Sequence, residues 1–403
     1  MVDPEHAWRA IVASVTPLPS ALRAYDQSLF HYLAQPVLAD RDIPAADRSA
    51  MDGYAVRADD VAAAPAVLRV VGEIPAGSTA QPALTPGECV RIFTGANVPA
   101  DADAVVMVED TEATADDRVT ILSPISRGRN ILRRGENTRQ GAVLLQQGAV
   151  IDATAVAVCA AVGCVELRVH ARPRVTVITT GAELRQPAER AGIHEVRDSN
   201  GPMLVAAIAE HGFGPADWVC VPDDRAELLT ALRQALDGSD VVLVTGGVSV
   251  GKYDLVPDVI REAGATIHYH GVAMKPGKPQ LFATVGSNRC LFGLPGNPLA
   301  VLTGFHEFAL PALRYLSGCL EADCRRLLRF PLLSGVTTKG RQRHYLLGRL
   351  VHAAGGMAVE PVPNAGSADL VAGSKADGMI IVPVGVSSVP AGACVDFRPW
   401  RLL

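Results

Sequence analysis

The chain has 403 residues, a formal net charge of −5 and an aromatic content of 5%. Its length is typical of roughly two to four domains, and its charge and few aromatic residues argue against a nucleic-acid-binding protein. The longest near-apolar run, residues 155–165, is too short to span a bilayer. Asp3 and Glu5 near the N-terminus are not typical of a secretory signal. We therefore expect a soluble, cytoplasmic protein without membrane or nucleic-acid partners.

The N-terminal third combines helical, extended and β-rich segments. Residues 5–15 and 20–34 carry apolar residues at helical spacing, and an extended segment begins at residue 35. Short apolar segments separated by Gly and Pro turns then predict a small all-β insert near residues 45–130. Its strands are expected at 68–72, 89–93 and 104–108.

Two turns of this insert carry polar residues of interest. Asp52 lies in the turn at residues 49–55, which contains the Asp-Gly signal, and Thr94 begins the Thr-Gly-Ala turn at 94–96. Judged alone, both residues are typical turn formers. Their interpretation as functional residues depends on the rest of the chain.

From residue 173 onward, strands and helices alternate. This alternation predicts a doubly wound, mostly parallel sheet with helices on both faces. The expected strands are 174–179, 218–221, 241–244, 266–270, 280–285 and 289–293, and the expected helices are 202–211, 225–236, 255–263 and 299–316. After residue 325 the helical pattern ends, and short apolar segments between Gly and Pro turns predict a β-domain.

The fold class that follows is a multidomain α/β protein. We expect an N-terminal region at 1–170 that contains the β-rich insert, a central α/β domain at 171–325, and a β-barrel-like domain at 326–403. Ligands of such α/β sheets bind at the carboxyl ends of the strands. Polar residues at or just after predicted strand ends therefore carry the functional prediction, and they are Glu183, Asp223, Ser249, Asp254, Lys275 and Lys278.

Three Gly/Pro-rich turns next to apolar strands organise the central domain, at 245–254, 274–279 and 293–298. Glycine lets the backbone approach a ligand closely, and successive N–H groups in such turns bind anions. Lys275 and Lys278 add positive charge, and Asp254 is placed like a metal ligand. The turns predict a pocket for a phosphorylated or oxyanionic ligand with a divalent metal. The ligand-binding residues expected in them are Gly246, Gly247, Ser249, Gly251, Pro295, Gly296, Asn297 and Pro298.

Other interpretations of these features remain open. Residues 246–252 fit the first part of a phosphate-binding P-loop, but Tyr253 stands where Ser or Thr would hold Mg²⁺. A purely structural strand-to-helix turn is a further alternative. His268 and His270 alternate on a predicted strand and could bind a metal, although a structural role is the simpler interpretation without a clear third ligand.

Six motifs together resemble the MoeA family of molybdopterin molybdenumtransferases, which is related to the E domain of gephyrin. The motifs span most of the chain in the family's order, at 49–55, 91–96, 180–184, 245–254, 275–279 and 293–298. The resemblance implies the insertion of molybdate into adenylylated molybdopterin with release of AMP. It also implies Mg²⁺ and an elongated homodimer, in which the cleft lies between the α/β domain of one subunit and the N-terminal segments of the other.

The resemblance also implies roles for individual residues. Glu183, Asp223 and Asp254 would hold Mg²⁺, and Lys275 and Lys278 would offset the negative charge of the substrates. Asp52 and Thr94 would reach the cleft from the partner subunit, and we expect these seven residues to be catalytic.

Two positions depart from the family pattern, because Ala182 and Asn137 stand where carboxylates are usual. These departures keep a non-catalytic pterin-binding or scaffolding protein open as an alternative, beside the less favoured P-loop nucleotidase.

Overall fold

The computed structural model describes residues 1–114, 116–248, 255–286 and 288–400. The chain forms two compact units. We call Met1–Gln35, Gln147–Asp152 and Glu166–Leu403 the large unit, and Pro36–Gln146 with Ala153–Val165 the small unit. No helix within the described ranges has the length and apolar character needed to cross a membrane.

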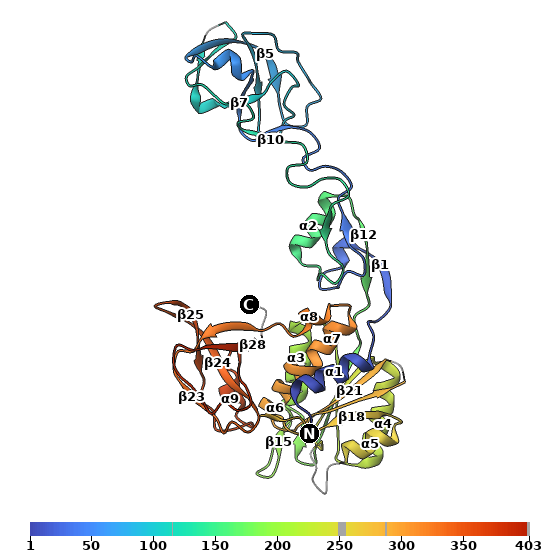
Figure 1. Cartoon of the computed structure of the whole chain (residues 1–403). Helices are drawn as coiled ribbons and strands as arrows, with labels where there is room; N and C mark the ends of the chain where they lie inside the picture. Colours follow the sequence, from blue (N-terminus) through green and yellow to red (C-terminus); the bar gives the residue numbers. More distant parts are fainter. Residues whose placement is uncertain (115, 249–254, 287, 401–403) are drawn as a thin grey trace. The chain divides into compact units, whose positions relative to one another are not determined.

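A six-stranded mixed sheet forms the centre of the large unit (Figure 1). Its first four strands in spatial order are parallel, and β20 runs antiparallel to both of its neighbours. The order is β16 (Asp217–Val221), β13 (Val175–Thr180), β17 (Val241–Thr245), β21 (Arg289–Leu294), β20 (Leu281–Val285) and β18 (Thr266–His270). The predicted mostly parallel sheet is confirmed.

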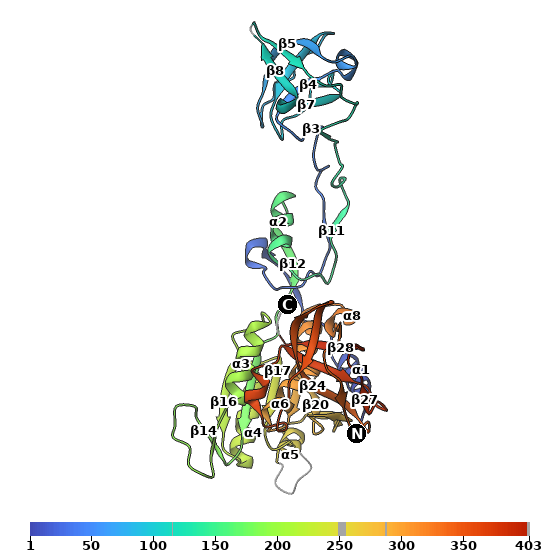
Figure 2. The same ribbon diagram turned by 90° about the vertical axis from the view of Figure 1, so that its left-hand side faces the viewer.

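Helices cover both faces of this sheet, because its buried strands are apolar on both sides. Alternate side chains of one strand point to opposite faces: Val177 packs into one core, while Ile178 packs into the other. The first core also takes side chains from α1 (Pro4–Ser14), α3 (Asn200–Glu210), α6 (Pro298–Gly304) and α7 (Leu310–Leu316). The second core is completed by α4 (Arg225–Gly238) and α5 (Val256–Glu262), and Figure 2 shows α3 and α4 beside β16.

The C-terminal part of the large unit is a small, almost closed β-barrel. Antiparallel pairing runs β25-β24-β26-β28-β22, and an isolated bridge between Leu332 and Val359 brings the two edge strands together. Phe397 and Ile380 are among the side chains that fill its interior. The strands are β22 (Leu328–Pro331), β24 (Arg343–Ala353), β25 (Gly356–Pro361), β26 (Gly378–Val382) and β28 (Cys394–Pro399). The predicted barrel-like domain is confirmed.

The small unit contains a six-stranded sheet of its own, drawn in blue to green in Figure 1. Apolar side chains pack on both of its faces, with Val106 on one and Val105 on the other. Its strand order is β7 (Ala104–Met107), β4 (Gly53–Val56), β6 (Glu88–Ile92), β5 (Ala66–Ile74), β9 (Arg118–Ile121) and β8 (Thr111–Thr114). This sheet is the predicted β-rich insert.

Shorter elements connect these parts. They are η1 (Tyr25–Gln27), β2 (Val37–Leu38), β3 (Arg48–Ser49), η2 (Ala58–Val61), η3 (Val108–Asp110), β10 (Ile131–Leu132), β11 (Val143–Leu145), α2 (Ala153–Ala161), β14 (Leu184–Arg185), β15 (Val196–Arg197), β19 (Met274–Lys275), α8 (Glu321–Cys324), β23 (Val336–Thr337), α9 (Leu370–Gly373) and β27 (Ser388–Val389).

The helix predicted at 20–34 is wrong. Residues Ser20–Ala24 form β1, which pairs antiparallel with β12 (Glu166–His170), and a 3₁₀ turn follows. The apolar residues that suggested a helix do not form a buried stripe, since Leu22 is 56% exposed whereas Leu33 is 1% exposed. Pairing with a distant strand therefore determines the local structure here.

The helix predicted at 299–316 is present, but it is not uniform. A π-helical segment, Phe305–Ala309, separates α6 from α7. Such segments are frequent at functional sites. This one buries the carboxylate of Glu307 completely.

Candidate functional site

The carboxyl ends of the parallel strands meet at one edge of the large sheet. Thr180 is in register with Val221 on β16, and Thr245 is in register with Thr179 on one side and Leu294 on the other. The Gly/Pro-rich turns at 246–248 and 295–297 therefore begin side by side, next to the loops that carry Glu183 and Asp223. This edge brings together several residues that the sequence predicted separately.

Close packing explains why Gly246 begins the first turn. Its φ is 98°, and a Cβ atom there would lie 1.9 Å from the carbonyl oxygen of Thr180. Its own N–H donates to the carbonyl of Leu294, with 3.3 Å between the two atoms. Gly247 also has positive φ, at 57°. At Gly246, therefore, glycine allows two strand ends to approach, and its amide is already engaged within the fold.

Two residues that the sequence analysis did not select hold these turns together. Asn200 donates from Nδ2 to Thr245 Oγ1 at 3.2 Å and to the Gly296 carbonyl at 2.7 Å. The buried Asp198 accepts hydrogen bonds from Thr179 Oγ1 and from the Gly201 N–H. Their local sequence signal is the Asp-Ser-Asn run at 198–200, which comes just before the predicted helix at 202–211.

The turns also border a cavity of about 820 Å³, which we call the lysine cavity. Its described lining includes the cations Lys275, Lys278 and Lys339 with His344, and no Asp or Glu. Pro295 and Asn297 belong both to this lining and to the carboxyl edge of the sheet. A concave surface with lysines and without carboxylates attracts anions.

The two predicted lysines lie on a short loop whose backbone is fixed. The Val272 N–H donates to the Lys278 carbonyl at 2.8 Å, and Gly277 adopts a φ of 98°. The neighbouring strand β24 supplies His344, which is paired with Lys275 on β19. Burial and the positive charge of Lys275 lower the pKa of His344, which favours a neutral imidazole.

A hydrogen bond between Asn297 and Ser367 joins the N-terminus of α6 to the C-terminal part of the chain. Asn297 donates from Nδ2 to Ser367 Oγ at 3.0 Å, and the Leu299 N–H donates to the Ser367 carbonyl at 3.0 Å. Ser367, Lys339 and His344 line the cavity but were not predicted, because they are far from the three turns in sequence. Only the folded chain places them on the same cavity as Lys275 and Lys278.

In the small unit, Asp52 and Thr94 are in direct contact, although they belong to motifs that are separate in the sequence. Asp52 Oδ1 accepts hydrogen bonds from the Thr94 N–H and from Thr94 Oγ1, each at 2.7 Å. These two bonds hold the pKa of Asp52 below its usual value. The carboxylate is therefore ionised and oriented, with its position set by a neighbouring turn.

Replacement of Thr94 by Val tests this orientation. The substitution removes the hydroxyl donor and keeps the backbone donor, so the pKa of Asp52 is expected to rise part of the way toward its usual value. Because the folded-state pKa is lowered, the stabilising effect of this carboxylate is present above the unfolded-state pKa. It is lost as the pH falls through the folded-state pKa. A carboxyl NMR titration measures the shift, and an unchanged Asp52 pKa would contradict the assigned hydrogen bond.

The predicted metal ligands are only partly described. Glu183 and Asp223 are exposed side chains after the adjacent strands β13 and β16, and Asp254 lies outside the described residues. No group of three metal-binding side chains occurs among the residues that the structure describes. Mg²⁺ is commonly held by one or two carboxylates together with phosphate and water. Glu183 and Asp223 at one sheet edge fit that kind of site.

Other predicted residues also lie outside the described ranges, or have contacts that explain them structurally. Ser249, Gly251 and Tyr253 also lie outside the described residues. His268 Nε2 contacts Thr284 Oγ1 at 2.8 Å, whereas His270 Nε2 contacts the Val248 carbonyl at 2.7 Å. The two histidines thus have separate partners, which supports the structural interpretation.

Three family models match consecutive parts of the chain. The MoeA N-terminal region (domain I and II) matches residues 2–163, a probable molybdopterin binding domain matches 176–315, and the MoeA C-terminal region (domain IV) matches 329–400. The chain belongs to the MoeA family. The resemblance drawn from the six motifs is confirmed, and this MoeA-family protein is an enzyme of molybdenum cofactor biosynthesis.

Individual relatives agree with this assignment over nearly the whole chain. The molybdopterin molybdenumtransferase of Staphylococcus aureus (strain COL) is 35% identical over 396 residues, which cover 97% of this chain and 94% of the relative. The protein of that name from Staphylococcus epidermidis (strain ATCC 12228) is 33% identical, with 92% and 89% covered. The solved molybdopterin biosynthesis MoeA protein from Pyrococcus horikoshii OT3 has a TM-score of 0.82 and 25% identity, with 99% and 100% covered.

Proposed function

We propose that this MoeA-family enzyme inserts molybdate into adenylylated molybdopterin and releases AMP in a Mg²⁺-dependent reaction. The lysine cavity is the observation that carries this proposal. It presents Lys275, Lys278 and Lys339 without a carboxylate in its described lining, and it borders the carboxyl edge of the sheet. The names of the curated relatives support the same substrate class.

The charges of the cavity suit this chemistry. Molybdate is a dianion, and the adenylylated pterin carries a pyrophosphate link, so both substrates repel each other. Lys275 and Lys278 offset that repulsion and hold the oxyanion near the helix start at Asn297. Fixed positive charge is most effective where negative charge develops in the transition state.

The carboxylates at the sheet edge have a different role. Glu183 and Asp223, together with Asp254, would hold Mg²⁺. The ion would polarise a phosphoryl oxygen and stabilise the charge of the departing AMP. The two described carboxylates are exposed, so they are accessible to a hydrated ion and to phosphate oxygens.

A direct assay tests the proposed reaction. The protein is incubated with adenylylated molybdopterin and Mg²⁺, with and without molybdate, and AMP is measured by chromatography. We expect AMP release that requires both molybdate and Mg²⁺. Tight pterin binding without AMP release would support a non-catalytic binding protein, and ATP turnover without pterin would support a nucleotidase. Cytoplasmic location and the absence of nucleic-acid partners stay predictions.

We also infer a homodimer in which Asp52 and Thr94 of one subunit complete the site of the other. Mixing Asp52→Ala with Lys278→Ala tests this inference. If the residues act across subunits, each mixed dimer contains one intact site, and random reassociation restores about a quarter of the wild-type activity. A mixture as inactive as its components, or a monomeric mass by light scattering at micromolar concentration, would exclude the shared site.

A further inference from the structure

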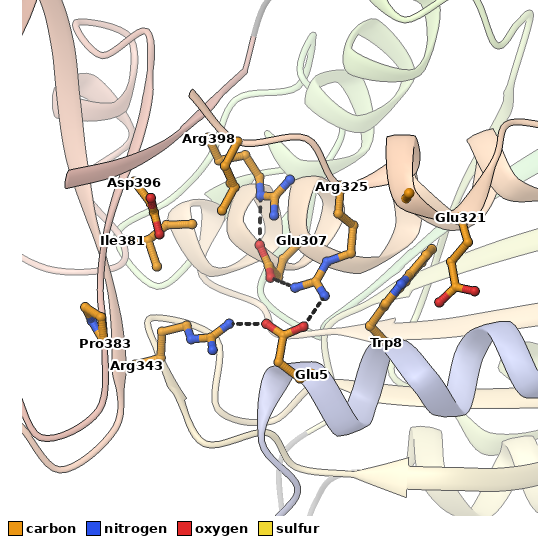
Figure 3. Close-up of a pocket in the computed structure, with 12 residues that line it drawn as sticks. Glu5, Trp8, Glu307, Glu321, Arg325, Arg343, Ile381, Pro383, Asp396 and Arg398 are labelled. Atoms are coloured by element: carbon orange, nitrogen blue, oxygen red, sulfur yellow. Dashed lines mark hydrogen bonds and ion pairs between the residues drawn. The ribbon is translucent and has the colours of Figure 1, made fainter. Parts of the chain in front are cut away.

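A second cavity of the large unit, of about 600 Å³, contains a chain of ion pairs (Figure 3). We call it the arginine cavity. It lies between α1, the π-helical segment and the barrel strands β24 and β28. Its charged residues come from five different parts of the chain, and those in the ion-pair chain are Glu5, Glu307, Arg325, Arg343 and Arg398.

Glu5 on α1 is the connecting carboxylate of this chain of ion pairs. Its two oxygens accept separate hydrogen bonds, from Arg343 at 2.7 Å and from Arg325 at 2.8 Å. Arg325 also donates to Glu307, which accepts a further bond from Arg398 at 2.8 Å. Burial opposes ionisation of Glu5, but the hydrogen bonds and charges of the two arginines outweigh it and lower the Glu5 pKa.

The strand that Glu5 contacts also forms part of the lysine cavity. Arg343 and His344 are consecutive residues of β24, and consecutive side chains of a strand point to opposite sides. Arg343 lines the arginine cavity, whereas His344 lines the lysine cavity. On the neighbouring strand β19, Lys275 pairs with His344. Arg343, the partner of Glu5, is therefore next in sequence to His344. His344 and its strand partner Lys275 both line the lysine cavity.

The backbone before Glu5 binds the segment that leads into β19. The Val2 N–H donates to the Gly271 carbonyl at 3.0 Å, and the Ala273 N–H donates to the Val2 carbonyl at 2.8 Å. Ala273 in turn accepts from the Arg343 N–H at 3.3 Å. Residues 2–5 thus contact the segment just before β19 through the backbone and β24 through the Glu5 side chain.

We propose that Glu5 is a positioning residue for the lysine cavity: by binding Arg343 it fixes β24 against β19 and so sets the separation of His344 and Lys275. Glu5 does not line the lysine cavity and does not touch the anion. Its effect acts through the strand, because an anion site requires its charged groups to be held in a fixed arrangement. The inference rests on the proposed function of the lysine cavity as the oxyanion site.

The test measures tungstate binding to the full chain by titration calorimetry, together with thermal unfolding. In Glu5→Gln the carboxylate charge is lost at nearly constant shape, and we expect the Kd for tungstate to rise about tenfold. Arg343→Gln should have the same effect, and Arg343→Lys, which retains the charge, should recover part of the affinity. All titrations are run well below the unfolding temperature of each variant, so loss of folded protein does not contribute.

A matched control lies on β25, whose Glu360 pairs with Arg349 of β24. Glu360→Gln removes the 2.6 Å ion pair with Arg349 at the far part of β24, away from both cavities. It should leave the Kd unchanged. Lys278→Ala separates the two hypotheses, because it should abolish binding if the lysine cavity is the oxyanion site. If Lys278→Ala abolishes binding while Glu5→Gln binds like wild type, the positioning role is wrong. If Lys278→Ala binds like wild type, the proposed function itself is wrong.

Discussion

Lys278→Ala is expected to lower molybdate-dependent AMP release about 100-fold, which is the usual effect of removing one group that stabilises transition-state charge. Lys278 lines the lysine cavity, where the described lining contains no carboxylate that its loss would leave unpaired. The lost interaction is therefore mainly that with the substrate anion. The measurement is kcat/KM for AMP formation at saturating adenylylated molybdopterin and varied molybdate.

Lys375→Ala is the matched control for this prediction. Lys375 is exposed just after α9 and does not line the lysine cavity. Removal of the same charge from this position should change kcat/KM by less than about twofold, since exposed charges are largely screened by salt. Equal losses in the two variants would mean that net charge, and not the cavity, determines the rate.

Glu307→Gln is expected to reduce the free energy of unfolding of the large unit by about 3–5 kcal/mol, as is typical when one partner of a buried ion pair is removed. Glu307 is 0% exposed and is bound by Arg325 and by Arg398, which is itself 5% exposed. The neutral amide leaves the buried guanidinium of Arg398 without its carboxylate partner and leaves Arg325 with Glu5 alone. Guanidinium unfolding followed by tryptophan fluorescence measures the loss, because Trp8 packs against Arg325 with the guanidinium carbon 5.6 Å from the ring centroid.

An exposed ion pair provides the comparison. Asp258 and Arg261 on α5 are joined at 2.8 Å, but their side chains are 65% and 58% exposed. Asp258→Asn should cost less than about 1 kcal/mol, because water already screens this pair. If Glu307→Gln were as mild as Asp258→Asn, the arginine cavity would not depend on its buried carboxylate.

The sequence was sufficient for the central sheet because its signals are local. Apolar strands such as 241–244 are flanked by turns and amphipathic helices, and this alternation predicts a mostly parallel sheet with helices on both faces. The helix predicted at 20–34 was wrong for the opposite reason. The apolar residues of this segment have helical spacing, but pairing with the distant strand Glu166–His170 overrides that preference. The π-helical segment around Glu307 likewise has no local sequence signal.

Only some of the residues that line the candidate site could be predicted from the sequence. Lys275, Lys278 and Asn297 belong to turns with recognisable composition, and the structure places them on one cavity. His344 and Ser367 come from segments that carry no such signal, because their role arises from the packing of the C-terminal part against the α/β sheet. The ion pair of Glu5 with Arg343 joins residues 338 positions apart and could not be inferred from either segment.

The most direct test of the lysine cavity as the oxyanion site is a crystal structure of the protein soaked in tungstate. Tungsten scatters anomalously, so its position is located without assumptions about the surrounding density. We predict the strongest anomalous peak in the lysine cavity, in contact with Lys275 and Lys278. A saturated peak elsewhere, such as among the arginines around Glu5, with none in the lysine cavity, would contradict the account.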